Sequence, residues 1–475
     1  MDKKILKNYI YSNIYQLLLV ITPLITTPFL TRIMGSETLS INSWTANIVQ
    51  WFVLFGIMGV NNYGNREIGK DRDNKDTVSK TFLEIFYMQI LTMLLASLVY
   101  FTYILILDGP YKTIMILQGI TLIGVALDIT WFFYGIEDLK KATIRNVLVK
   151  LTGIALIFGF IRSSDDLILF VLINTITGVL GQIIMWIELK KHINFVSVKF
   201  NDVIKRIRPN FALFIPQIAI SVYSVLDITM LGALYFDMRH VNFYEQSSKL
   251  VKMFMFFITS IGSVMISRVA NIHAQNKHDE IQQTLTKTYS LAMYLSIPMI
   301  FGIASVIGNF ISWFLPEEYY VVKNMIIAIS PIILFISISN VYGIQYMVPT
   351  GMTKQYSRSV ILGAFVNFCI NLTLIPKFGA YGAIIGSVVA EFVVTITQYL
   401  TVKDKLKIGI KISSIIRILI ASTLMFIASY TTGYLGINIM VNLLQAFIGI
   451  IVYVLTLLVL KDTFLLNLIK GVIKR

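Results

Sequence analysis

Residues 166–191 read DLILFVLINTITGVLGQIIMWIELKK, an apolar run that ends in two lysines. A helix needs about 20 apolar residues to cross a hydrocarbon core about 30 Å thick, and this run is long enough. Similar runs follow one another along the whole chain. The fourteen runs are 9–31, 39–60, 82–107, 112–134, 143–161, 166–189, 210–234, 247–268, 288–311, 322–347, 357–376, 380–401, 412–430 and 436–460. The sequence therefore predicts an all-α polytopic membrane protein with about 14 transmembrane helices.

The composition excludes several classes of protein. Of the 475 residues, 56% are hydrophobic and only 14% are charged, whereas an average soluble domain is about 25% charged. This balance excludes an ordinary soluble enzyme and a disordered protein. The net charge of +15 is typical of nucleic-acid binders, but they do not combine it with such hydrophobicity. Cys369 is the only cysteine, so neither a disulfide nor a Cys-based metal site is available.

The basic residues sort by side of the membrane. Alternate connections, beginning with the N-terminus, hold 30 of the 40 basic residues, and the opposite connections hold 6. Lysine and arginine favour cytoplasmic loops, so the sequence predicts that both termini are cytoplasmic. An even number of spans satisfies this arrangement. The basic loops would then face anionic lipid head groups.

The two halves of the chain echo each other. Asn8 stands just before the first run and Asn210 begins the seventh, and Arg66 and Arg268 follow them at the same spacing. Transporters are commonly built from such repeats, with the substrate site between the halves. The echo is compatible with a transporter of this kind.

Of the 40 basic residues, 36 are assigned to connections or to span ends, and four remain inside predicted spans. A charge at the centre of a span costs about 2.5–3.5 kcal/mol on insertion scales. Lys150 lies well inside its span and is expected to face a ligand or a partner rather than lipid. Arg417 lies near the end of its span and is expected to snorkel to the cytoplasmic interface. Lys249 and Lys252 share one helical face, and either a cavity mouth or a ring at the head groups fits them.

Polar stripes run along two of the predicted spans. Gln217, Ser221 and Ser224 follow one another at helical spacing on segment 210–234, where Asp227 shares a face with Tyr223. Gln16 belongs to a similar stripe on the first segment. A wetted cavity explains such stripes, and hydrogen bonds between packed helices explain them as well. The four histidines lie in connections without metal-ligand spacing, so we expect no metal site.

Seven stretches of the chain together resemble one family. They are TPFLTRIMG at 27–35, YGNREIG at 63–69, WFFYGIEDLKKATIRNVLVK at 131–150, PQIAISVYSVLDITMLG at 216–232, YEQSSKLVK at 244–252, GIQYMVPTG at 343–351 and LIPKFGAYGAIIGSVVAE at 374–391. In this order they resemble the oligosaccharide (polysaccharide repeat-unit) flippases of the MOP superfamily, which also contains MATE exporters and lipid II flippases. One departure is Ile228, which stands after Asp227 where members of this type often have lysine.

The resemblance implies a MATE-like fold of two six-helix lobes, at 1–195 and 196–402, followed by two more helices and a basic tail at 403–475. It also implies a transporter rather than an enzyme. Such a protein moves an undecaprenyl-diphosphate-linked oligosaccharide from the cytoplasmic to the outer leaflet of the bacterial plasma membrane, for capsule, exopolysaccharide or other surface polysaccharide. Alternating access coupled to H⁺ or Na⁺ is expected, without a cofactor, and polysaccharide polymerase or assembly proteins are the expected protein partners.

Candidate site residues follow from this substrate. A diphosphate needs cations in a low-dielectric cavity, where ion pairs are stronger than in water. The cation candidates are Arg32, Lys150, Lys249, Lys252 and Arg66. Polar candidates for the sugar are Gln16, Asn47, Gln50, Trp51, Gln217 and Ser221. The acids Asp227, Asp128 and Glu391 are candidates for ion coupling or for a structural role.

Three other functions remain open at this point. A lipid II flippase would share the fold and the lipid carrier. A MATE-like exporter of organic cations would favour acids in its cavity, whereas the spans here carry cations at least as readily. A membrane scaffold for polysaccharide assembly would have no need of buried cations and polar stripes.

Overall fold

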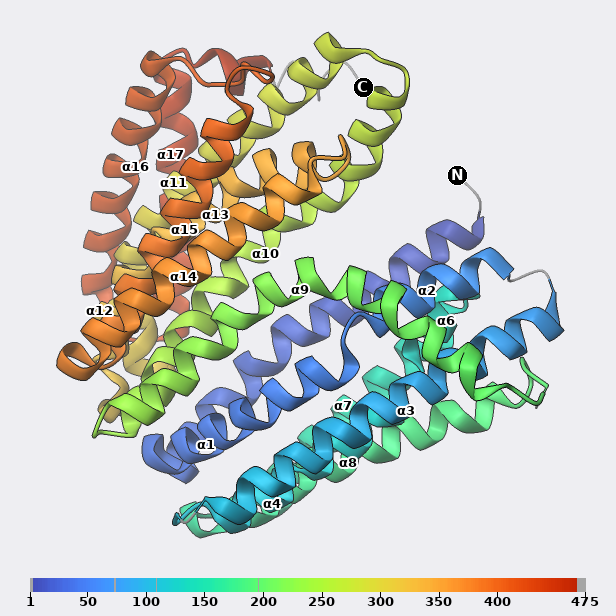
Figure 1. The fold of residues 1–475 in the computed structure, drawn as a ribbon. Coiled ribbons are helices and arrows are strands. Elements are labelled where there is room, and N and C mark those ends of the chain that lie inside the picture. The colour runs from blue at the N-terminus through green and yellow to red at the C-terminus, as the bar shows by residue number, and fades with distance from the viewer. Residues whose placement is uncertain (1–2, 72–73, 108, 195, 468–475) are drawn as a thin grey trace. The chain divides into compact units, whose positions relative to one another are not determined.

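The computed structural model describes residues 3–71, 74–107, 109–194 and 196–467, and this part of the chain is helical without any strand. The chain divides into two compact units, Met1–Thr229 and Met230–Arg475. The division falls inside the second predicted lobe, and the predicted boundaries of the lobes stay predictions. The all-α fold class is confirmed (Figure 1).

The first unit contains nine helices and most of a tenth among its described residues. They are α1 (Lys3–Ile57), α2 (Val60–Asp71), α3 (Lys75–Ile106), α4 (Lys112–Gln118), α5 (Ile120–Ala126), α6 (Thr130–Gly135), α7 (Leu139–Phe160), η1 (Ser164–Asp166), α8 (Leu167–Leu189) and α9 (Phe200–Leu234), whose last residues belong to the second unit.

The second unit continues with further helices and short helical turns. They are α10 (Arg239–Ala274), α11 (His278–Phe314), η2 (Glu317–Tyr319), α12 (Val322–Ile329), α13 (Ile332–Ser339), η3 (Asn340–Met347), α14 (Thr353–Phe378), α15 (Ala380–Val402), α16 (Ile412–Thr432), η4 (Gly433–Leu435) and α17 (Ile439–Val459).

Each predicted span coincides with one or more of these helices. Within the described residues, ten helices are long and apolar enough to cross a membrane, or eleven if the bent pair Glu317–Ile329 and Ile332–Met347 forms one span. The protein is therefore a multi-span membrane protein, and the count of fourteen spans stays a prediction.

The first two predicted spans form α1, which is broken at Gly35. This residue has φ 71° and ψ 171°, a conformation that side chains with a Cβ rarely adopt. The break lies in the gap that the sequence predicts between residues 31 and 39. The chain changes direction at this residue, between the two apolar segments of α1.

Helix α2 replaces the connection that the sequence predicts after residue 60. Met58 has φ 48°, which ends α1, and the chain then turns into a polar helix with the sequence VNNYGNREIGKD. This helix forms because Tyr63 and Ile68 are 2% and 0% exposed in a cluster with Trp131 and Phe132. Burial of these side chains stabilises a segment whose average hydropathy is typical of a loop.

Helices α14 and α15 pack along their lengths in the second unit (Figure 1). Gly379 turns the chain between them at φ 55°. A Cβ on this residue would collide with His240 and Tyr235. The helices α16 and α17 form a second pair that packs on α11.

Candidate functional site

A cavity of about 610 Å³ opens in the first unit between α2, α6, α7 and α8. Its lining is strongly polar for a helical membrane protein. The lining residues are Asn61, Asn62, Asn65, Asp128, Thr130, Trp131, Tyr134, Arg145, Asn146, Val149, Lys150, Gly178 and Gln182. By the predicted topology, all four helices contribute the end that faces the cytoplasm.

A break in the fourth predicted span shapes one wall of this cavity. The chain leaves α5 at Leu127 and enters α6 at Thr130, so backbone carbonyl groups lose their helical partners. The fully buried Gln89 on α3 replaces them, because its Nε2 donates to the carbonyl oxygens of Val125, Ala126 and Asp128 at 2.9–3.1 Å. Its Oε1 accepts from the Trp131 indole at 3.0 Å. One side chain thus fixes the break.

The break directs Asp128 and Thr130 to the cavity and towards α7. The Asp128 Oδ1 accepts from the backbone N–H of Thr130 at 2.9 Å and from the Thr130 hydroxyl at 2.5 Å. The Arg145 guanidinium donates to the same hydroxyl at 2.7 Å. Arg145 is only 7% exposed, so the chain holds a guanidinium in a nearly dry position at the cavity wall. Arg145 was not among the candidate site residues predicted from the sequence.

Lys150 follows Arg145 on α7 and lines the same cavity. Its side chain is exposed, so its ammonium can reach the interior of the cavity. Of the predicted site residues, the structure therefore brings together Lys150 and Asp128. Whether they contact a substrate stays a prediction.

The cavity also contains carboxamides that the sequence analysis missed. Asn61, Asn62 and Asn65 are exposed on one face of α2, and they face the cavity together with Asn146 and Gln182. The signal was present as an i, i+4 spacing of Asn61 and Asn65. It was overlooked because the segment reads as a polar connection rather than as a helix.

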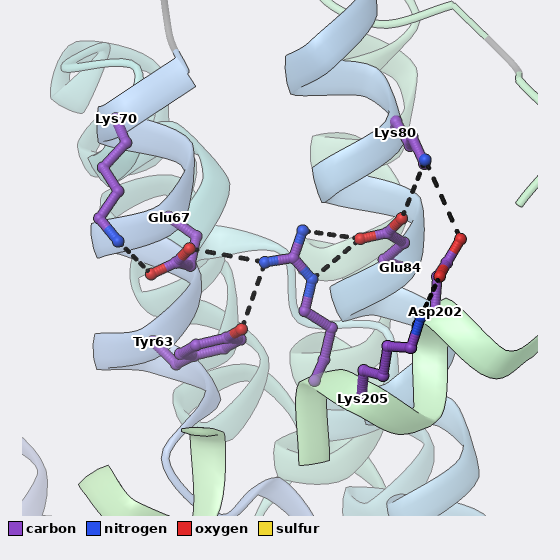
Figure 2. Close-up of polar contacts among 8 residues, drawn as sticks. Tyr63, Glu67, Lys70, Lys80, Glu84, Asp202 and Lys205 are labelled. Atoms are coloured by element: carbon purple, nitrogen blue, oxygen red, sulfur yellow. Dashed lines mark hydrogen bonds and ion pairs between the residues drawn. The ribbon is translucent and has the colours of Figure 1, made fainter. Parts of the chain in front are cut away.

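Opposite this face, α2 contributes to an ion-pair cluster with α3 and α9. The Arg206 Nε and Nη2 contact the Glu84 Oε2 at 2.9 and 2.7 Å. Its Nη1 lies 3.5 Å from Glu67 and donates to the Tyr63 hydroxyl at 3.3 Å. Figure 2 shows Tyr63 and Glu67 on one helix and Glu84 on another.

The same cluster extends to the surface. Lys80 lies 3.8 Å from Glu84 and 3.9 Å from Asp202, and Lys205 lies 3.2 Å from Asp202 (Figure 2). Arg66, a predicted diphosphate contact, pairs with Glu67 at 2.9 Å and its guanidinium lies 5.6 Å from the centre of the Tyr63 ring. Its exposure keeps it accessible at this end of the unit.

Four further candidates of the first unit lie on α1 and are not among the residues that line this cavity: Arg32, Asn47, Gln50 and Trp51. Arg32 is exposed and donates to the Pro28 carbonyl at 3.0 Å. The Trp51 indole donates to the Thr229 hydroxyl at 2.9 Å. Asn47 is half-buried, and its side chain donates to the Ser43 carbonyl at 2.9 Å. Gln50 is exposed.

Three polar candidates fall outside the described side chains. They are Gln16, Gln217 and Ser221, which lie in α1 and α9. Asp227 on α9 is described and is 2% exposed. The predicted sugar contacts on these two helices stay predictions.

The second unit holds the other candidates. Lys249 pairs with Glu245 one turn earlier on α10 at 2.7 Å, and Lys252 is exposed on the same helix. Glu391 on α15 is 8% exposed. None of the described residues forms a group of three or more His, Cys, Asp or Glu side chains that could hold a metal ion.

Arg417 has a carboxylate partner that follows α17, and its predicted position at the cytoplasmic interface stays a prediction. Its guanidinium lies 3.7 Å from the carboxylate of the fully buried Asp462, which also accepts from the Tyr294 hydroxyl at 2.6 Å. The Asp462 carboxylate is buried, and the Arg417 guanidinium is a cation close enough to stabilise it. Asp462 was not a candidate from the sequence, because 168 positions separate it from its partner Tyr294.

Comparison with known proteins identifies the family. The family described as "Polysaccharide biosynthesis protein" matches residues 5–273, more than half of the chain. The chain belongs to this family. A relative in Escherichia coli (strain K12), named "Putative O-antigen transporter", is 25% identical over 408 residues, which cover 84% of this chain and 96% of the relative.

Solved structures share the fold of this family member. The chain resembles "Lipid II flippase MurJ, inward closed conformation" with a TM-score of 0.76 and 17% identity, over 97% of this chain and 100% of the other. An inward-facing multidrug resistance MATE family transporter of the MOP superfamily has a TM-score of 0.59 and 10% identity, over 81% and 98% of the two chains. The chain therefore has the fold of these two structures, and the family match confirms the resemblance to polysaccharide biosynthesis proteins. The relative is named as a transporter, and the two solved structures are named as a flippase and a multidrug resistance transporter.

Proposed function

We propose that this protein is a flippase for an undecaprenyl-diphosphate-linked oligosaccharide. It would move the repeat unit of a capsule, an exopolysaccharide or another surface polysaccharide from the cytoplasmic to the outer leaflet. Membership of the polysaccharide biosynthesis family supports this proposal, as does a relative named as an O-antigen transporter. The observation that carries it is the cavity that contains Lys150 and Arg145.

The charges of this cavity suit a diphosphate better than an organic cation. Arg145 is nearly dry and Lys150 is accessible, so both can attract phosphate oxygens in a medium of low dielectric constant. Asp128 is the acid among the lining residues, and it already accepts two hydrogen bonds from Thr130. An organic-cation exporter would need an acid at the centre of its site.

The other predicted cations would act along the path of the diphosphate. We propose Arg66 as a contact at the cytoplasmic mouth, and Arg32, Lys249 and Lys252 as contacts later in transport. Arg32 and Arg66 lie on α1 and α2 of the first unit, and Lys249 and Lys252 lie on α10 of the second. Rocking of the two predicted lobes would expose the substrate to one side at a time.

We further propose that an H⁺ or Na⁺ gradient drives the cycle. Asp227 and Glu391 are acids that lie 2% and 8% exposed on helices, and a carboxylate so placed must be protonated or balanced by a cation. Replacement of Asp227 by Asn tests the role of this acid. Normal transport in an imposed gradient together with an unchanged melting temperature would exclude both a coupling and a structural role.

The proposal also fixes a location. We place the protein in a bacterial plasma membrane with both termini in the cytoplasm, next to the polymerase and assembly proteins that consume the flipped repeat unit. The distribution of 30 against 6 basic residues supports this orientation.

Complementation tests the proposed function against its rivals. The gene is expressed in one strain that lacks its repeat-unit flippase and in another that is depleted of its lipid II flippase. We expect surface polysaccharide to return in the first strain and growth to remain defective in the second. Rescue of the second strain alone would assign lipid II as the substrate. Rescue of neither strain by protein present at normal level would favour an exporter or a scaffold.

A further inference from the structure

Five carboxamide side chains line the cavity of the first unit. They are Asn61, Asn62, Asn65, Asn146 and Gln182. None of them forms a side-chain hydrogen bond with any residue that the structure describes, and the Gln182 Oε1 is buried without a partner there. Buried polar atoms are normally bonded, so this oxygen calls for a donor from outside the described chain.

Their spacing brings these groups onto three walls of one volume. Asn61 and Asn65 are one turn apart on α2, and Asn146 stands one turn before Lys150 on α7. Gln182 stands one turn after Gly178 on α8. The carboxamides and the lysine ammonium can therefore contact neighbouring parts of a single ligand.

The chemistry of a carboxamide selects the class of ligand. Each carboxamide offers two N–H donors and an oxygen with two lone pairs. A phosphate accepts hydrogen bonds only and would leave these oxygens unbonded, and an ammonium donates only and would leave the N–H groups unbonded. A sugar hydroxyl both donates and accepts, so it satisfies both ends of the group.

Two further features suit a sugar ring. A Cβ built on Gly178 would meet no atom within 4 Å, so there is open space beside Gln182. The Tyr134 ring lines the cavity and is 41% exposed, which offers an aromatic face against which a pyranose can pack.

We propose that these five carboxamides form a glycan subsite, which binds the sugars nearest to the diphosphate of the lipid-linked substrate. This inference rests on the proposed function and adds that the cavity recognises the sugar part of the substrate. The Lys150 ammonium binds the diphosphate, and the carboxamides bind a sugar that is attached to it. The subsite thus makes the protein select a glycosylated carrier over the bare lipid diphosphate.

Binding measurements on the full-length protein in lipid nanodiscs test this assignment. The probes are undecaprenyl diphosphate and the same lipid carrying one N-acetylglucosamine, N-acetylgalactosamine or galactose. The readout is the sugar increment, defined as the ratio of the Kd of the bare lipid to that of the glycosylated lipid. For the wild type we expect an increment of about tenfold with at least one sugar, which corresponds to one or two net hydrogen bonds.

Two variants remove the subsite in different ways. Gln182→Leu removes the hydrogen-bonding groups, and Gly178→Leu fills the open space. In both, the increment should fall to about one while bare undecaprenyl diphosphate binds as before. Asn174→Ala is the matched control, because Asn174 lies on the same helix, donates to the Phe170 carbonyl at 2.8 Å and does not line the cavity.

The outcomes separate this inference from the proposed function. Binding of the bare lipid without any sugar increment, or an increment that survives in both variants, would overturn the subsite and leave the flippase proposal standing. Failure of the wild type to bind any of the lipids would overturn both. A merely structural Gln182 would show itself as a lower melting temperature of Gln182→Leu, whereas we expect no decrease because the oxygen has no partner among the described residues.

Discussion

The Arg206 guanidinium holds the Glu84 carboxylate with two of its nitrogens, at 2.9 and 2.7 Å. The Glu84 side chain is only 5% exposed and the Arg206 side chain 23%. Arg206 lies near the beginning of α9, and Glu84 lies on α3. The pair therefore links α9, which continues into the second unit, to the core of the first unit. A buried carboxylate without its cation is costly, so the pair is expected to be sensitive to truncation of either partner.

Removal of the arginine should destabilise the protein. We expect Arg206→Ala to lower the stability by about 1–3 kcal/mol, because Glu84 stays buried and loses its charged donors. The melting temperature in detergent measures this loss. Lys80→Ala is the control, since Lys80 is 54% exposed and 3.8 Å from Glu84, and exposed pairs contribute at most about 1 kcal/mol. Equal effects of the two substitutions would contradict the special role of Arg206.

Gly64 marks the contact between α2 and α6. A Cβ at this position would overlap the ring of the buried Trp131. Gly64→Ala should therefore cost about 1–3 kcal/mol and lower the melting temperature. The same substitution at Gly159 on α7, where a Cβ would meet no atom within 4 Å, should leave the melting temperature unchanged or raise it. A stable Gly64→Ala protein would show that α2 does not pack on Trp131 as described.

His240 predicts a loss of stability in acid. Its Nδ1 accepts from the backbone N–H of Ala380 at 3.1 Å, which requires a neutral imidazole. Burial lowers the pKa of His240, Asp237 opposes this and Arg239 lowers the pKa further. The stabilisation is therefore complete above the unfolded pKa of about 6.5 and is lost as the pH falls through the lower folded pKa.

Thermal unfolding between about pH 5 and pH 8 measures this effect. His240→Gln keeps an acceptor oxygen that does not titrate, so its melting temperature should fall less in acid than that of the wild type. Identical pH profiles would exclude a contribution from His240.

The Asp462 carboxylate is expected to stabilise the packing of the C-terminal helices. It accepts from the Tyr294 hydroxyl and from the backbone N–H groups of Phe464 and Leu465 at 2.6–3.1 Å. Tyr294→Phe removes one of these bonds and should cost about 0.5–1.5 kcal/mol. Asp462→Ala removes all three bonds and also the carboxylate next to Arg417, so the melting temperature of this variant should fall further. A larger effect of Tyr294→Phe would contradict the central position of the carboxylate.

The helices could be predicted from the sequence because lipid imposes a local rule. Backbone groups inside a bilayer must bond within their own helix, so a long apolar run is sufficient to predict one. The break of α1 at Gly35 followed from the same reasoning. Helix α2 did not, because its nine polar or small residues form a helix only through the burial of Tyr63 and Ile68 against other segments.

The site was predicted in part for a similar reason. Lys150 was singled out because a lone charge within an apolar run is costly wherever the chain folds. Arg206 was counted only as one of many cytoplasmic cations, since its partner Glu84 stands 122 positions away in the sequence. The carboxamides of α2, α7 and α8 each look ordinary in the sequence, and only their meeting in one cavity distinguishes them.

Translocation in proteoliposomes tests the central claim most directly. The full-length protein is reconstituted with an undecaprenyl-diphosphate-linked oligosaccharide, and its transfer between leaflets is followed for the wild type, Lys150→Ala and the control Lys140→Ala, whose exposed side chain does not line the cavity. The account predicts transfer by the wild type and the control, and a rate at least about tenfold lower for Lys150→Ala, as expected for the loss of one charged contact. Transfer no faster than in protein-free vesicles, or an unchanged rate for Lys150→Ala, would contradict it.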